Sequence, residues 1–273
     1  MNLQNLKNKK TLIRIALVII LLIPAVVVIK SRSNSKPEII VEEPTSRRIT
    51  EPVNVIPINE RPYVSIKPLA DGRNLVLNII QLKKPAQKVD YELEYQSGTM
   101  LQMVMGTLEI DQLPVSKQEL LGSCSAGGAC TYHEDITGGN LLLRFSDSAE
   151  GNYVVKSDWR YFDNQDKSDE VASRDAKFQL SSSALATQRY SIVFNSPGYP
   201  EGLTKDVIAD SYSLSTATVL TGEGELSIRI NEESATATIV GFDGESWTEF
   251  DTTIDGKQVT AEVELMQFYT VVR

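Results

Sequence analysis

The longest apolar run of the chain, at Thr11–Ile29, restricts its fold more than any other feature. Its sequence, TLIRIALVIILLIPAVVVI, contains one charge, Arg14. As a helix rising ~1.5 Å per residue it would reach ~28 Å, close to the ~30 Å hydrocarbon thickness of a bilayer. Lysines flank the run on both sides and it has no polar face, which disfavours a buried core helix. The run therefore predicts a transmembrane segment, with a water-soluble body after Lys30.

A cleaved signal peptide is the alternative explanation of this run. Such a peptide has an apolar stretch of ~7–15 residues, followed by small residues at the cleavage site. Here the run ends in VVVIKSR, so Ser31 and Ser33 would have to serve as the small residues beside Lys30 and Arg32. We therefore expect an uncleaved signal anchor at residues 11–29.

Basic residues near the span predict its orientation. Residues 1–10 hold three lysines and the α-amino group, and Arg14 adds a charge on the same side. The far flank holds Lys30, Arg32 and Lys36, so the bias is small. Positive charge beside a span resists translocation. The sequence thus predicts a single-pass membrane protein with a cytoplasmic tail at 1–10 and an extracytoplasmic body in the cell envelope.

The charge of the body limits its partners. The first 36 residues hold seven basic side chains and no acidic one, so the other 20 basic and 36 acidic residues give the body about −16. Nucleic acid and anionic lipid headgroups would be repelled by such a surface. The sequence also lacks a P-loop, a dinucleotide-binding fingerprint and an H-E-x-x-H motif. Calcium and cationic polymers stay open as ligands.

A proline-rich stretch, residues 30–60, separates the span from the body. Proline fixes φ and removes an amide donor, so this stretch is expected to be an extended, semi-rigid linker. Its apolar patches, Ile39–Val41 and Val53–Ile56, leave open the alternative that part of it docks as an edge strand.

Period-two alternation dominates the chain from Arg61 onward and predicts an all-β body. In VDYELEY, Val89–Tyr95, the apolar residues share one face, while Glu92 and Glu94 lie on the solvated face. Two stretches depart from this pattern: Val115–Leu121 is predicted as one helical turn and Lys205–Ala209 as a short helix.

A polar break at Asp163–Asp175 and the following SSSALATQ divide the body. Short strands separated by Gly- and Pro-rich turns are typical of β-sandwiches. We therefore predict two Ig-like β-sandwich modules, at 61–182 and 183–273. One large sandwich is the alternative.

Two cysteines, Cys124 and Cys130, lie in GSCSAGGAC, where two glycines allow the backbone to fold back. Outside the cytoplasm such a pair forms a disulfide readily. The alternative is zinc held by both cysteines and His133, but this C-x5-C-x2-H set supplies three ligands where structural zinc takes four. The disulfide is the prediction, and an inert reduced pair is the other possibility.

Several further residues suggest chemistry that ordinary structural roles explain better. His133 could activate Ser123 or Ser125, but no G-x-S-x-G elbow surrounds them. Three further groups have structural explanations.

Calcium could be bound by the acidic residues Asp163, Asp166, Asp169 and Glu170, but they fail the EF-hand pattern. A sugar could stack on Trp159, Tyr161 and Phe162, but these aromatic residues suit a core or its rim. The methionines Met100, Met103 and Met105 are expected to fill a core.

The C-terminal residues carry one resemblance. The turn GFDGESW at Gly241–Trp247, followed by VTAEVELMQFYTVV, resembles the closing hairpin of β-sandwich modules in bacterial cell-surface proteins. The layout of the whole chain resembles uncharacterised single-pass envelope proteins of candidate-phyla bacteria. The resemblance implies an envelope location and the roles of adhesion and spacing.

Together these features predict a membrane-anchored, non-catalytic extracytoplasmic protein for adhesion, envelope structure or binding of a protein or glycan partner. We expect no catalytic residue, cofactor or metal ligand. The alternative is a glycan-directed surface hydrolase. Its acid and base would be two carboxylates from distant loops, ~5–10 Å apart in a cleft.

Overall fold

The computed structural model describes residues 51–273, whose regular structure is almost entirely β-strand. Within this range no helix is long and apolar enough to cross a membrane. The predicted tail at 1–10, the anchor at 11–29 and the linker up to Thr50 lie outside the described residues, so these three remain predictions. Two short 3-10 helices, η1 (Ile58–Glu60) and η2 (Leu185–Thr187), interrupt the strands.

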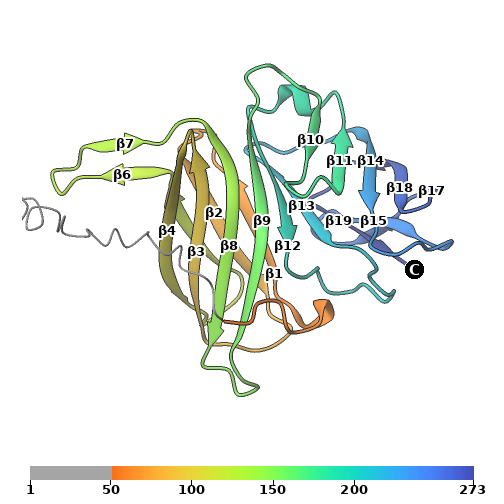
Figure 1. Cartoon of the computed structure of the whole chain (residues 1–273), viewed down its shortest axis with the longest axis horizontal. Helices are drawn as coiled ribbons and strands as arrows, with labels where there is room; N and C mark the ends of the chain where they lie inside the picture. Colours follow the sequence, from red (N-terminus) through yellow and green to blue (C-terminus); the bar gives the residue numbers. More distant parts are fainter. Residues whose placement is uncertain (1–50) are drawn as a thin grey trace, which may run out of the picture. The chain divides into compact units, whose positions relative to one another are not determined.

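A nine-stranded antiparallel sheet runs through the whole body (Figure 1). Its order is β16-β15-β19-β13-β12-β9-β8-β3-β4, so β4 and β16 are its two edges. Its strands are β3 (Lys88–Ser97), β4 (Met100–Glu109), β8 (Ile136–Ser146), β9 (Tyr153–Asp163), β12 (Tyr190–Ser196), β13 (Ser211–Thr216), β15 (Thr238–Phe242), β16 (Trp247–Glu249) and β19 (Phe268–Val272).

Three smaller sheets complete the fold. The three-stranded sheet has the order β1-β2-β5, the five-stranded sheet has the order β10-β11-β14-β18-β17, and β6 and β7 form a two-stranded ribbon. These strands are β1 (Tyr63–Pro68), β2 (Asn74–Gln81), β5 (Val115–Leu120), β6 (Gly122–Cys124), β7 (Cys130–Tyr132), β10 (Glu170–Ala172), β11 (Phe178–Ser181), β14 (Glu223–Arg229), β17 (Thr253–Asp255) and β18 (Gln258–Glu264).

The two predicted helical stretches are wrong. Val115–Leu120 is strand β5, which pairs with β2 from Val115 opposite Ile79 to Leu120 opposite Asn74. In the second stretch, Val207 forms an isolated bridge to Val272. In both places, hydrogen bonds to a distant strand override the weak local preference for a helix.

The two larger of three hydrophobic cores lie on opposite faces of the nine-stranded sheet, and a small third one contains Tyr63, Tyr199, Phe242 and Phe268. The first is shared with the three-stranded sheet and the second with the five-stranded sheet, so each core lies between two facing sheets as in a β-sandwich. Strand β12 contributes to both: Ile192 and Phe194 belong to the first core, and Val193 belongs to the second. Because both of its faces are covered, β12 reads as a continuous apolar run rather than an alternating one.

The boundary predicted between residues 182 and 183 falls just before η2 and β12. Strand β12 pairs with β9 from Tyr190 opposite Asp163 to Phe194 opposite Trp159, so the sheet is continuous across this boundary. Whether the two parts can fold separately stays a prediction. In this structure they share one sheet.

The C-terminal end of the predicted linker packs onto the body. The Asn54 backbone N–H donates to the Val154 carbonyl (2.9 Å), and the Asn54 side chain exchanges hydrogen bonds of 2.9 Å with the Lys156 backbone. Glu51 pairs with Arg144 on β8. Asn54 thereby contacts part of β9 that β12 does not reach, although residues 51–57 form no strand there.

Candidate functional site

The ribbon β6–β7 projects from the body (Figure 1) and is closed by a disulfide between Cys124 and Cys130. The two cysteines lie directly opposite each other across the ribbon. The predicted disulfide is therefore confirmed. The zinc alternative is wrong, because both sulfurs are bonded to each other and no thiolate is left to bind a metal.

His133 lies at the base of this ribbon. Its Nδ1 is 2.8 Å from the Tyr95 hydroxyl, and its backbone N–H donates to the Leu121 carbonyl at 2.9 Å. Burial raises the pKa of Tyr95 to about 12, so this hydroxyl keeps its proton well above neutral pH. These contacts give His133 a structural role, which is to fasten the ribbon to the sheet.

The acidic loop after β9 is organised by its own side chains. Asp163 forms an ion pair with Arg189 (2.7 Å). Asn164 accepts a hydrogen bond from the Ser168 N–H (2.7 Å) and donates to the Ser168 and Leu185 carbonyls. Within residues 51–273, no group of three or more His, Cys, Asp or Glu side chains is arranged to hold a metal ion.

The three aromatic residues considered for sugar stacking divide between core and surface. Trp159 and Tyr161 belong to the first core, with 0% and 5% of their surface exposed. Phe162 points to the other face and is half-buried against the second core. The Arg160 guanidinium lies 5.0 Å from its ring centre. Of the three aromatic rings, that of Phe162 is therefore the most open to a ligand.

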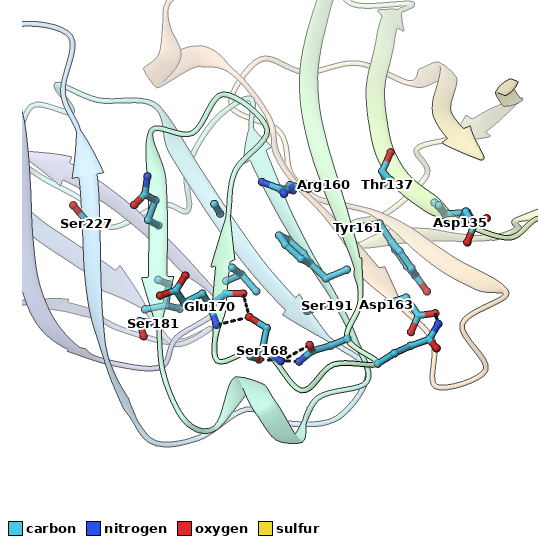
Figure 2. Close-up of a pocket in the computed structure, with 18 of the residues that line it drawn as sticks. Asp135, Thr137, Arg160, Tyr161, Asp163, Ser168, Glu170, Ser181, Ser191 and Ser227 are labelled. Carbon is cyan, nitrogen blue, oxygen red and sulfur yellow. Dashed lines mark hydrogen bonds between the residues drawn. The ribbon is translucent and has the colours of Figure 1, made fainter. Parts of the chain in front are cut away.

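A polar groove of about 980 Å³ lies between β9 and the edge formed by β10, β11 and β14 (Figure 2). Its wall includes Arg160, Phe162 and the carboxylates of Asp163, Glu170 and Glu225. Figure 2 shows the bonds between Ser168 and the Glu170 backbone, which fix this side of the groove. Hydroxyl, amide and carboxylate groups around a half-buried ring are chemistry that suits a polyol.

The edge strand β4 exposes large apolar side chains that the sequence reading assigned to a core. Met100, Leu101, Met103 and Met105 are 61%, 64%, 41% and 57% exposed, so the core prediction for the three methionines is wrong. Met103 and Met105 lie opposite Glu94 and Glu92 of β3 and share their solvated face. Among the described residues β4 pairs only with β3, and its sequence MLQMVMGTLE contains neither lysine nor proline. We call Leu101, Met103 and Met105 the β4 stripe.

The solvated position predicted for the carboxylates beside the β4 stripe is confirmed. Glu92 and Glu94 are both partly exposed, and Tyr91, Leu93 and Tyr95 between and beside them are buried. Glu92 forms an ion pair with Arg144 at 2.9 Å, and Glu94 accepts a hydrogen bond from Asn140 at 3.4 Å. These carboxylates are engaged on an open face rather than gathered in a cleft.

Comparison with known proteins adds no name to these sites. No protein-family model, curated protein or solved structure matches the chain. The resemblance of the C-terminal hairpin to surface modules remains an expectation. The β4 stripe and the polar groove are the two features of the body that bear on its function.

Proposed function

We propose that this protein is a membrane-anchored, non-catalytic extracytoplasmic module that binds a partner protein by strand addition to β4. The observation that carries the proposal is the β4 stripe on a ten-residue strand that is paired on one side only within residues 51–273. A free strand edge offers unpaired N–H and C=O groups to another chain, and proteins usually protect such an edge with charge, proline or a bulge. Strand β4 has no such protection except Glu109 at its end.

Burial of the β4 stripe would supply binding free energy, and the neighbouring carboxylates would favour a partner strand that carries basic residues. Fully burying a Leu or Met side chain contributes ~1.5–3 kcal/mol, and backbone pairing fixes the register of the added strand. On β3, Asp90, Glu92 and Glu94 lie on the same face as the stripe. An added strand that alternates apolar and basic residues would match both features.

The predicted anchor and charge fit this role. An anchored body at about −16 stays soluble and separated from anionic headgroups by repulsion. The partner would therefore be met in the envelope rather than on the lipid surface.

The test uses the full-length protein in membranes, with a photo-crosslinking amino acid at position 103. We expect a discrete crosslinked partner, lost when Leu101 and Met105 are both changed to Lys. The matched control is the same crosslinker at Val219, an 87% exposed apolar residue away from β4. Identical products from both positions, or no loss in the double Lys variant, would contradict the proposal.

The polar groove favours a second candidate, hydrolysis of an envelope glycan. Glu170 and Glu225 line it from different strands, as a pair of catalytic carboxylates would. Incubation with envelope polysaccharide tests this candidate. Release of reducing ends that disappears in Glu170→Gln or Glu225→Gln, and persists in the Glu109→Gln control, would replace the binding proposal with an enzymatic one.

A further inference from the structure

A second cavity, of about 520 Å³, lies apart from both the polar groove and the β4 stripe. One wall is the outer side of β1 and β2, including Tyr63, Ser65 and Lys67. The opposite wall comes from β13 and from the segments around Leu220 and Met266. A volume of this size is in the range of small-molecule sites.

Ser213 on β13 is the least expected residue of this cavity. It is 2% exposed, and its Oγ is buried without a hydrogen-bond partner within residues 51–273. It lies opposite Phe194 and Phe268, and so on the sheet face that β1 covers. A buried hydroxyl without a partner is unfavourable, and such groups are rare in folded proteins. Its position in the cavity wall means that a bound molecule could supply the missing partner.

Four other polar side chains of the cavity, those of Ser65, Asn78, Ser116 and Thr216, are already engaged. Asn78 donates to the Ser65 hydroxyl (3.2 Å) and accepts from the Ser116 hydroxyl (2.7 Å). The Thr216 hydroxyl donates to the Thr218 carbonyl at 2.6 Å. The Ser213 hydroxyl differs from these four groups because it is buried without a hydrogen-bond partner.

The charges of the cavity favour an anion. Lys67 is exposed and forms no ion pair among the described residues. Asp243 also lines the cavity, but its carboxylate accepts from the N–H groups of Glu245 (2.7 Å) and Ser246 (2.8 Å). Those bonds lower the pKa of Asp243 and direct its charge into its own turn. Lys67 is left as the charge that a ligand can pair with.

We propose that this cavity binds a small carboxylate that carries a branched apolar chain. Ser213 and Lys67 supply the donors for the carboxylate. Ile80, Leu220 and Met266 supply an apolar surface for the chain. This ligand site is independent of partner binding at β4, so either can fail without the other.

The experiment is calorimetric titration of the full-length protein in lipid nanodiscs with 4-methylpentanoate, and with 4-methylpentanamide as the uncharged match. We expect saturable 1:1 binding of the acid that weakens with salt, and at least tenfold weaker binding of the amide. N-acetyl-leucine serves as a second acid. Binding tighter than that of 4-methylpentanoate would indicate a peptide end as the source of the carboxylate, and weaker binding would indicate a free acid.

Two pairs of variants test the residues. Ser213→Ala should weaken binding of 4-methylpentanoate about tenfold, because one hydrogen bond to a charged group is lost. Ser211→Ala is its control: Ser211 is equally buried two residues earlier, 3.4 Å from the Thr270 hydroxyl and outside the cavity wall. Lys67→Gln should weaken binding about tenfold and remove its salt dependence, whereas Lys117→Gln on β5 should change neither.

Melting temperatures distinguish a loss of binding from a loss of folding in these variants. Ser213→Ala removes an unpaired hydroxyl, so its melting temperature should not fall, whereas that of Ser211→Ala should. Equal affinity for acid and amide, unchanged affinity in Ser213→Ala, or no saturable binding of the acid would each overturn the proposal.

Discussion

The two edge strands of the nine-stranded sheet differ in length and in the exposure of their apolar side chains. Strand β16 has only three residues, and its Trp247 packs on Phe242 and Phe268 while the indole N–H donates to the Glu201 carbonyl at 2.9 Å. Strand β4 has ten residues and exposes the β4 stripe. A short, packed edge resists pairing with other chains, and a long apolar one invites it. From this difference we expect Trp247 at the β16 end to contribute more to stability than the β4 stripe, which is the recognition surface in our proposal.

The largest effect expected from this comparison is at Trp247. Trp247→Ala removes a ring that packs on Phe268, and should lower the free energy of unfolding by about 2–3 kcal/mol, below the range for a fully buried ring because Trp247 is only half-buried. Met103→Ala should change it by less than about 0.5 kcal/mol. Urea unfolding measures both. Similar losses at the two positions would remove the contrast between the edges.

The disulfide tests whether the β6–β7 ribbon stabilises the body. Closing so short a loop is worth about 2 kcal/mol on the chain-entropy model. Because the ribbon projects from the sheet, we expect the double variant Cys124→Ser, Cys130→Ser to lose less than this in global unfolding. Amide exchange should rise in the ribbon and stay unchanged at β16. Exchange that rises throughout the sheet would show instead that the ribbon supports the whole fold.

Alkaline pH offers a third measurement. Burial raises the pKa of Tyr63 to about 12, whereas a tyrosine in the unfolded chain titrates near 10. Its contribution to stability is therefore fully present below pH ~10 and is lost as the pH rises toward ~12. Between pH 8 and pH 11 the Tyr63→Phe variant should therefore lose about 1 kcal/mol less stability than the wild-type protein. Tyr132→Phe, at a 40% exposed position on β7, is the control and should lose as much stability as the wild type.

The smallest change in stability is expected at the β4 stripe. Met103→Lys and Met105→Lys place charges on an exposed edge beside Glu94 and Glu92, so the free energy of unfolding should shift by less than about 0.5 kcal/mol. Self-association at high concentration, followed by light scattering, should fall. A large loss of stability would mean that the stripe is part of a core after all.

Much of the fold could be predicted from the sequence, because strand periodicity is local. In Val89–Tyr95 the alternation identified both the strand and its solvated carboxylates. The polar break at Asp163–Asp175 does not divide the two cores, because Ile192 and Phe194 of the first core lie after it. The shared sheet could not be predicted, because the apolar run of β12 does not reveal which elements cover its two faces.

The sites were harder to predict than the strands. In MLQMVMGTLE both faces of β4 have apolar residues, so no alternation shows which face is solvated. The disulfide was predictable because its two residues are close in sequence. Ser213 could not be singled out among the many serines, since its lack of a partner depends on β1, a strand far from it in the chain.

The attachment of Asn54 to β9 determines where mechanical load enters the molecule. A pull on the chain before Glu51 is received by the bonds to Val154 and Lys156 and by the ion pair with Arg144. Strands β8 and β9 lie inside the nine-stranded sheet, and β9 is next to β12, which belongs to both cores. If the body is tethered and binds a partner as proposed, tension would thus be spread through the middle of the body, and β4 would hold the partner without being the first strand under strain.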